Sequence, residues 1–156
     1  MRADPTADDI RWLRRAIDLS QKCPPAATAY SVGAVIVDAA GSEIASGYSR
    51  DTEPHLHAEE SALGRLEPDD ARLATATLYS TLEPCTERLS GRRPCADLIL
   101  AAGILHVVIA WREPDLFVAD CYGVERLREA GVTVLEIPEL APAAKAVNKH
   151  LRGIAI

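Results

Sequence analysis

Apolar side chains recur along the chain with two periods, one typical of helices and one of strands. Over residues 7–22 they fall on one face at helical spacing, behind a capping box of Thr6 and Asp9, which predicts an amphipathic helix. Runs rich in β-forming residues then occupy 30–38 and 43–49, separated by a short turn that contains a glycine. These two runs predict an antiparallel hairpin.

The rest of the chain continues to alternate between the two patterns. Helices are expected at 58–66, 94–102, 122–131 and 139–153, the last begun or interrupted near Pro142, and strands at 76–82, 106–111 and 132–137. The strand, helix and strand within 106–137 need a right-handed crossover, so the last two strands should be parallel. The expected fold class is therefore α/β, a three-layer α/β/α sandwich with a mixed five-stranded sheet.

Composition and charge narrow the class of protein. With 156 residues, 48% of them hydrophobic, the chain fits one globular domain over 1–156. A net charge of −6 argues against a nucleic-acid partner, because phosphate backbones bind dense Lys/Arg surfaces. The N-terminal segment lacks the apolar core of a signal peptide, and the most apolar run, 98–111, is shorter than a membrane span. We therefore expect a cytoplasmic protein with no membrane partner.

His57, Glu59, Cys85 and Cys95 form the one pattern that carries clear chemistry. Their order, His-x-Glu, then Pro-Cys and a later Cys, resembles the signature of the cytidine-deaminase-like superfamily of zinc enzymes. Two thiolates and a neutral imidazole would leave Zn²⁺ almost uncharged with one open tetrahedral position, where a water becomes acidic. The pattern therefore predicts three metal ligands, His57, Cys85 and Cys95, with Glu59 as the catalytic proton carrier.

The placement of these residues at helix starts supports the same prediction. His57 opens one expected helix and Cys95 another, and the positive end of a helix dipole favours a thiolate near the metal. The spacing of His57 and Glu59 does not put them on one helical face. The arrangement works only if His57 lies at the very start of the first turn, with Glu59 reaching back over the metal.

The distance between the two cysteines separates this chain from most of the superfamily. The signature usually has two residues between them, whereas nine intervene here, "TERLSGRRP". Such a loop resembles the riboflavin-pathway pyrimidine deaminases, as do "VGAVIV", "HAE", "TLEPC" and "AAG". The fungal-type branch is similar in "SGYSRDTEPHLHAE", "LEPCTERLSG" and "EPDLFV", so the resemblance covers about residues 32–137. Many relatives add a reductase domain, and we expect the deaminase domain alone.

The resemblance implies a reaction and a substrate class. The expected reaction is hydrolytic removal of an exocyclic amine, as ammonia, from a phosphorylated aminopyrimidine, the diaminopyrimidinone ribosyl or ribityl phosphate of riboflavin synthesis. The backbone around Leu82 and Pro84 would hold the amine. Candidate phosphate contacts are the arginines Arg50, Arg88, Arg92 and Arg93. The expected assembly is a homodimer, and Phe117 is a candidate for stacking on the base or for core packing.

Other functions fit the same residues less well. The alternative enzyme is a deaminase of a free nucleotide, nucleoside or base, including one dedicated to a secondary-metabolite pathway. A non-catalytic zinc module would have four protein ligands and no use for Glu59. A nucleic-acid editor would need a basic surface, which the acidic balance opposes.

Several single residues have simpler interpretations. A rival metal site of His55, His57 and Glu59 would need an extended strand, but "AEESAL" favours a helix. Glu60 is expected to be a solvated helix charge or a first-turn partner for the helix dipole. Cys23 and Cys121 stand outside the zinc pattern and are expected to be structural thiols.

Overall fold

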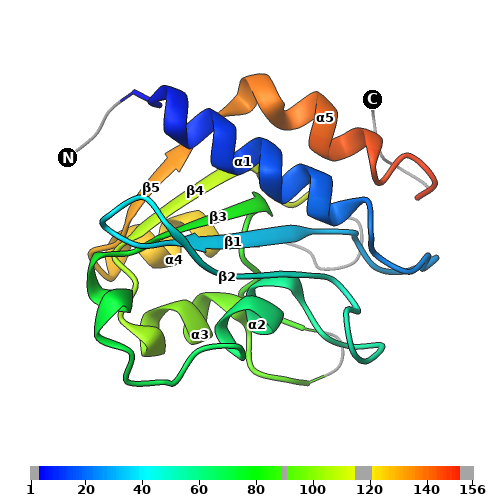
Figure 1. Ribbon diagram of the computed structural model, residues 1–156. Coiled ribbons are helices and arrows are strands. Elements are labelled where there is room, and N and C mark those ends of the chain that lie inside the picture. The colour runs from blue at the N-terminus through cyan, green and yellow to red at the C-terminus, as the bar shows by residue number, and fades with distance from the viewer. Residues whose placement is uncertain (1–3, 89–90, 115–120, 152–156) are drawn as a thin grey trace.

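A computed structural model describes residues 4–88, 91–114 and 121–151 of the chain and shows a central sheet between two layers of helices (Figure 1). The strands are β1 (Gly33–Val37), β2 (Glu43–Tyr48), β3 (Thr77–Leu82), β4 (His106–Trp111) and β5 (Thr133–Glu136). The helices are α1 (Ala7–Ser20), α2 (Ala58–Leu63), α3 (Cys95–Ala102), α4 (Gly123–Glu129) and α5 (Ala141–Ala146). Short 3₁₀ turns occupy Ala71–Thr75 and Pro138–Leu140.

The sheet has the strand order β2-β1-β3-β4-β5, so β2 and β5 form its two edges. β1 pairs antiparallel with both β2 and β3. β3, β4 and β5 run parallel to one another. The expected mixed sheet of five strands is therefore confirmed, including the antiparallel hairpin and the parallel last pair.

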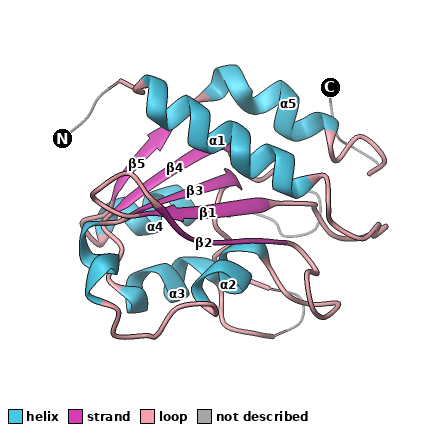
Figure 2. Ribbon diagram, viewed as in Figure 1, coloured by secondary structure: helices cyan, strands magenta, loops and turns pink. Residues whose placement is uncertain are grey.

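The helices cover both faces of this sheet, as expected for a three-layer sandwich. α1 and α5 lie together on one face, and α2 and α3 lie on the other (Figure 2). α4 packs beside α3 and against β5. None of the helices in the described ranges has both the length and the apolar composition that crossing a membrane requires.

Prolines lie near several of the helix ends that differ from the expected ones. α1 begins with the expected capping box, in which Thr6 and Asp9 exchange hydrogen bonds, and ends before Pro24. The helix expected over 139–153 is much shorter in the structure. Pro138 begins a 3₁₀ turn over Pro138–Leu140, and α5 then covers only Ala141–Ala146. Pro94 precedes α3 as its N-cap rather than lying in its first turn.

α2 lies close to β2, and this contact helps to fix the functional site. Gly47 of β2 faces α2, and a Cβ built there would lie 2.4 Å from the Oγ of Ser61. The absence of a side chain at Gly47 therefore lets the helix rest directly on the strand. The inner strands of the sheet are more deeply buried than β2. β1 is buried along its whole length, and β3 and β4 are buried after their first residues.

Candidate functional site

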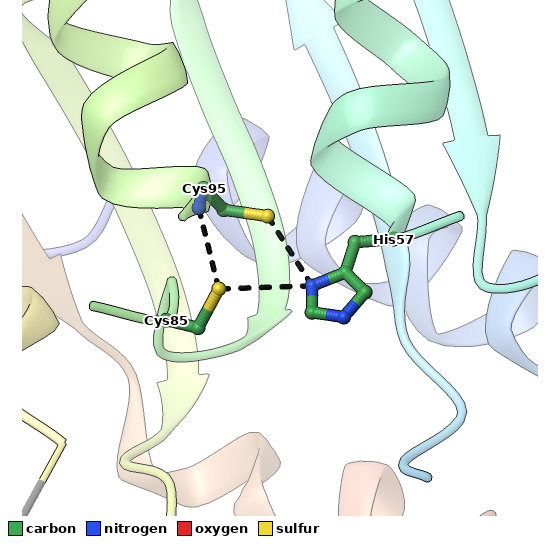
Figure 3. A group of neighbouring side chains, drawn as sticks. All are labelled: His57, Cys85 and Cys95. Atoms are coloured by element: carbon green, nitrogen blue, oxygen red, sulfur yellow. Dashed lines mark hydrogen bonds between the residues drawn. The ribbon is translucent and has the colours of Figure 1, made fainter. Parts of the chain in front are cut away.

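His57, Cys85 and Cys95 converge where two helices begin and one strand ends (Figure 3). His57 is the N-cap of α2, with the extended backbone that an N-cap adopts, and Cys95 is the first residue of α3. Cys85 follows β3 by three residues. The Nδ1 atom of His57 and the two sulfur atoms all lie within 4.8 Å of one another.

The geometry of this cluster fits a tetrahedral zinc ion. The His57 Nδ1 atom lies 3.7 Å from the Sγ of Cys85 and 3.4 Å from the Sγ of Cys95. Ligands at zinc–sulfur and zinc–nitrogen distances of about 2.3 Å and 2.0 Å are about 3.6 Å apart when the angle between them is tetrahedral. The donor set of two thiols and one imidazole is also one that zinc prefers.

The two thiols shift each other's pKa in opposite directions. The pKa of Cys85 is lowered to about 4, first because Cys95 donates a hydrogen bond to its sulfur and then because His57 lies beside it. The pKa of Cys95 is raised in turn, because it holds the proton and is fully buried. A metal cation placed between the sulfur atoms would replace that proton and stabilise both thiolates.

Glu59 lies in the first turn of α2 beside the cluster. Its side chain is buried, and the hydroxyl of Ser80 in β3 lies 3.4 Å from the Glu59 Oε1 atom. Burial raises the pKa of the Glu59 carboxyl. A raised pKa suits a carboxyl group that takes up and returns a proton near neutral pH.

A cavity of about 530 Å³ opens beside these residues. Its walls are residues 54–59 with the metal-ligand candidate His57, the end of β3 with Leu82, and the segment before β1. Pro84 is absent from the described residues that line the cavity, and its carbonyl oxygen accepts a hydrogen bond from the Cys121 thiol at 3.7 Å. The volume is that of a typical small-molecule site.

Arg50 lines the cavity but its donors are engaged by the protein. Its guanidinium donates to the carbonyl oxygens of Pro24 and Tyr30 and to the hydroxyl of Ser31, at 2.8–3.0 Å. Its backbone has a φ of 59°, which is unusual for a residue with a side chain. Arg50 therefore shapes the wall of the cavity by holding the segment that follows α1.

The arginines of the loop between the two cysteines differ in exposure. Arg88 is buried and lines the cavity, whereas Arg93 is exposed. Arg92 forms ion pairs with Glu53 at 2.7 Å and with Glu60 at 3.0 Å. Arg88 also pairs with Glu60, at 3.2 Å.

Glu60 has a larger role than the sequence suggested. It accepts a hydrogen bond from the backbone N–H of His57, which closes a capping box, and it joins Arg88 and Arg92. The capping box could have been found from the spacing of residues 57 and 60. The ion pairs of Glu60 with Arg88 and Arg92 could not, because no spacing rule relates a helix to a loop about thirty residues away.

Two further glutamates were missed by the sequence patterns. Glu113 lines the cavity, and burial raises the pKa of its carboxyl to about 7. Glu83 is buried and accepts hydrogen bonds from the backbone N–H groups of Glu113 and Val124. It thereby ties the residues that precede Cys85 to the start of α4.

The remaining candidates lie apart from the cluster. His55 is exposed, and among the described residues the group that could bind a metal does not include it. All four cysteines are free of disulfides. Cys23 and Cys121 are half-buried, and each donates to a backbone carbonyl oxygen. Phe117 lies outside the described residues.

Comparison with curated proteins finds relatives that carry a similar segment. A diaminohydroxyphosphoribosylamino-pyrimidine deaminase of Schizosaccharomyces pombe is 41% identical over 128 residues, which are 80% of this chain and 31% of the relative. The riboflavin biosynthesis protein RibD of Escherichia coli is 40% identical over 127 residues, 78% of this chain and 32% of the relative. The chain thus spans about a third of the length of these relatives.

Solved structures show the same fold. A diaminohydroxyphosphoribosylaminopyrimidine deaminase/reductase of Thermotoga maritima superposes with a TM-score of 0.76 at 32% identity, over 90% of this chain and 39% of that one. The Rib2 deaminase of Aspergillus oryzae gives a TM-score of 0.82 at 24% identity, over 94% of each chain, a likeness of fold. The resemblance to the riboflavin-pathway deaminases, fungal ones included, is thus confirmed.

The family assignment rests on a match over most of the chain. Residues 6–111 match the family described as the cytidine and deoxycytidylate deaminase zinc-binding region. That range contains all three members of the metal-binding cluster and Glu59. The chain therefore belongs to the zinc-binding cytidine and deoxycytidylate deaminase family.

Proposed function

We propose that this protein is a zinc-dependent deaminase that removes an amine from the diaminopyrimidinone ribosyl or ribityl phosphate of riboflavin synthesis. The observation that carries the proposal is the cluster of His57, Cys85 and Cys95 beside the buried Glu59, at the edge of a cavity of about 530 Å³. A structural zinc site would have four protein ligands and no buried acid beside an open position.

The chain's own residues divide the chemistry between them. His57, Cys85 and Cys95 would hold the zinc ion, which when bound supplies a Lewis acid that makes water more acidic. Glu59 would take a proton from the attacking water and deliver it to a ring nitrogen. It would then take the remaining proton from the hydroxyl added to the ring carbon and pass it to the amine, which leaves as ammonia. Leu82 also lines the cavity, and its backbone would hold the amine.

The substrate class is inferred from the relatives and from the cavity. The names of the S. pombe and T. maritima proteins state a phosphoribosylaminopyrimidine deaminase, and a structure of the A. oryzae Rib2 deaminase contains DARIPP. Arg93 is absent from the described residues that line the cavity, but its side chain is exposed in the loop between the cysteines, so it is the first candidate for the phosphate. Arg50, Arg88 and Arg92 already donate to protein acceptors, so we propose Arg93 ahead of them as the phosphate contact.

The assembly and location are part of the same proposal. We propose one deaminase domain over 1–156, acting in the cytoplasm as a homodimer on a small molecule rather than on nucleic acid. The free state of all four cysteines and the net charge of −6 support the location and the small-molecule substrate. Light scattering would test the proposed homodimer.

Two substitutions test the catalytic assignment. Glu59→Gln should keep zinc and fold while kcat falls by about 10²–10⁴-fold, because the proton carrier is lost. Cys85→Ser should lose zinc in metal analysis. Glu87→Gln is the matched control, because Glu87 lines the same cavity but is exposed, and its rate should stay near that of the wild type. Normal turnover by Glu59→Gln would contradict the assignment.

A substrate panel tests the pathway. Ammonia release would be measured with the riboflavin-pathway pyrimidine phosphate, its dephosphorylated form, cytidine, deoxycytidylate, guanine and a tRNA anticodon stem. The pathway phosphate should react fastest, and Arg93→Ala should lower its kcat/KM by about 10- to 150-fold without affecting the dephosphorylated form. A nucleoside or base as the best substrate would favour the alternative of a free nucleotide, nucleoside or base deaminase.

A further inference from the structure

Arg88 is a buried cation in the loop that separates the two cysteines. Its side chain is 1% exposed, and the loop contains no helix or strand in its described part. A guanidinium is stable in such surroundings only if its charge and its N–H donors are paired. The identity of its partners therefore indicates what the residue does.

The partners of Arg88 come from two other segments of the chain. Its Nη1 atom donates to the carbonyl oxygen of Arg93 at 3.1 Å and lies 3.2 Å from the Oε1 atom of Glu60. Its Nη2 atom donates to the carbonyl oxygen of His55. One rigid, planar group thus binds two backbone carbonyls and a carboxylate at the same time.

These contacts lie next to all three members of the metal-binding cluster. The two carbonyls belong to the residues that stand two positions before His57 and two positions before Cys95. Arg88 itself stands three positions after Cys85. The guanidinium therefore connects the chain segments that deliver the imidazole and both sulfur atoms, without itself being a ligand.

The hydrogen bonding of Arg88 is incomplete. Its Nε atom is buried and has no hydrogen-bond partner among the described residues. A buried donor in this state destabilises a fold, so stability alone is a poor reason for an arginine here. A role in fixing the relative positions of the three segments accounts for the contacts that Arg88 makes.

We propose that Arg88 is a positioning residue of the zinc site, which sets the distances between the imidazole and the two sulfur atoms. The proposal rests on the zinc site inferred above and adds a residue outside the ligand set. It also gives Arg88 a different role from contact with a substrate phosphate. Groups that orient metal ligands typically change metal affinity by about 10- to 100-fold when they are removed.

The experiment compares zinc affinity and cobalt spectra in three variants. Arg88→Met removes every side-chain N–H donor, and Arg88→Lys keeps the positive charge but not the planar guanidinium. Arg92→Met is the matched control, because it removes the neighbouring ion pair with Glu60. Zinc affinity is measured by competition with a chelator in the absence of substrate. The d–d band of the Co²⁺ form reports the ligand geometry, and circular dichroism reports the fold.

Arg88→Met should bind zinc about 10- to 100-fold more weakly than the wild type and shift the cobalt band. The zinc affinity of Arg88→Lys should lie between those of Arg88→Met and the wild type. Arg92→Met should change zinc affinity by less than about threefold. Wild-type affinity and spectrum in Arg88→Met would overturn the proposal, as would an equal loss in Arg92→Met. If Arg88→Met does not fold, Arg88→Lys decides by the same two readouts. Full zinc retention by Cys85→Ser would instead show that the proposed ligand set is wrong.

Discussion

Gly47→Ala should displace the helix that carries Glu59. Gly47 is buried in β2 and faces α2. A Cβ at this position would lie 2.4 Å from the Oγ and 2.5 Å from the Cβ of Ser61, and 2.7 Å from the backbone nitrogen of Ala62. Because the last atom belongs to the helix backbone, a change of the Ser61 rotamer cannot relieve the overlap. The helix itself must move.

The size of this overlap sets the expected effect. Non-bonded heavy atoms are normally separated by about 3.5 Å or more, so α2 has to move away from β2 by about 1 Å. Overpacking of this kind lowers the free energy of unfolding by about 1–3 kcal/mol. His57 and Glu59 move with the helix, and a displacement of about 1 Å at a reacting group can slow catalysis about 100-fold.

Urea unfolding and ammonia release measure the two effects of Gly47→Ala separately. Ser46→Ala is the control, because adjacent residues of a strand point to opposite faces of the sheet. It should leave the free energy of unfolding within about 0.5 kcal/mol of the wild type and the rate unchanged. Wild-type stability and kcat in Gly47→Ala would refute the argument that close contact between α2 and β2 positions the site.

Two further predictions concern buried polar groups. The pKa of Glu113 is about 7 in the folded protein against an ordinary 4.5, so its contribution to stability is complete below about pH 4.5 and is lost as the pH rises through 7. Between pH 4.5 and 8 the unfolding free energy of the wild type should fall by about 3 kcal/mol more than that of Glu113→Gln, and identical pH profiles would contradict this. Tyr79→Phe should destabilise by about 1.5–3 kcal/mol, because its hydroxyl donates to the buried Asp9 carboxylate at 2.7 Å. The exposed Tyr122→Phe is its control in denaturant unfolding, where an equal effect would count against the hydrogen bond.

The sheet could be predicted from the sequence because each strand is a short run with clear boundaries. The run at 106–111 is continuously apolar after its first residue and coincides with β4. The convergence of the metal-binding cluster was also predictable, because the order of residue types is specific. The position of His57 before the first turn of α2 followed from its two-residue spacing to Glu59, and the structure places it there.

The engagement of the arginines could not be predicted in the same way. Arg88 contacts the carbonyl oxygen of His55, which lies 33 residues away in the sequence, across a loop without a repeating pattern. Local patterns record which face of a helix or strand is buried, but not which loop carbonyl lies near a given side chain. The arginines therefore looked available for a phosphate, whereas Arg50 and Arg88 bind the protein's own backbone.

The edge of the sheet at β5 is protected against the addition of another strand. β5 has only four residues, and the carbonyl oxygen of Val134 accepts a hydrogen bond from Arg128 at 2.8 Å. Glu136 at its end is held by Arg112 at 2.9 Å. A short edge whose carbonyl is already bound, and which carries charged side chains, resists edge-to-edge aggregation. Copies of this chain should therefore associate through helices and loops rather than by extending the sheet at β5.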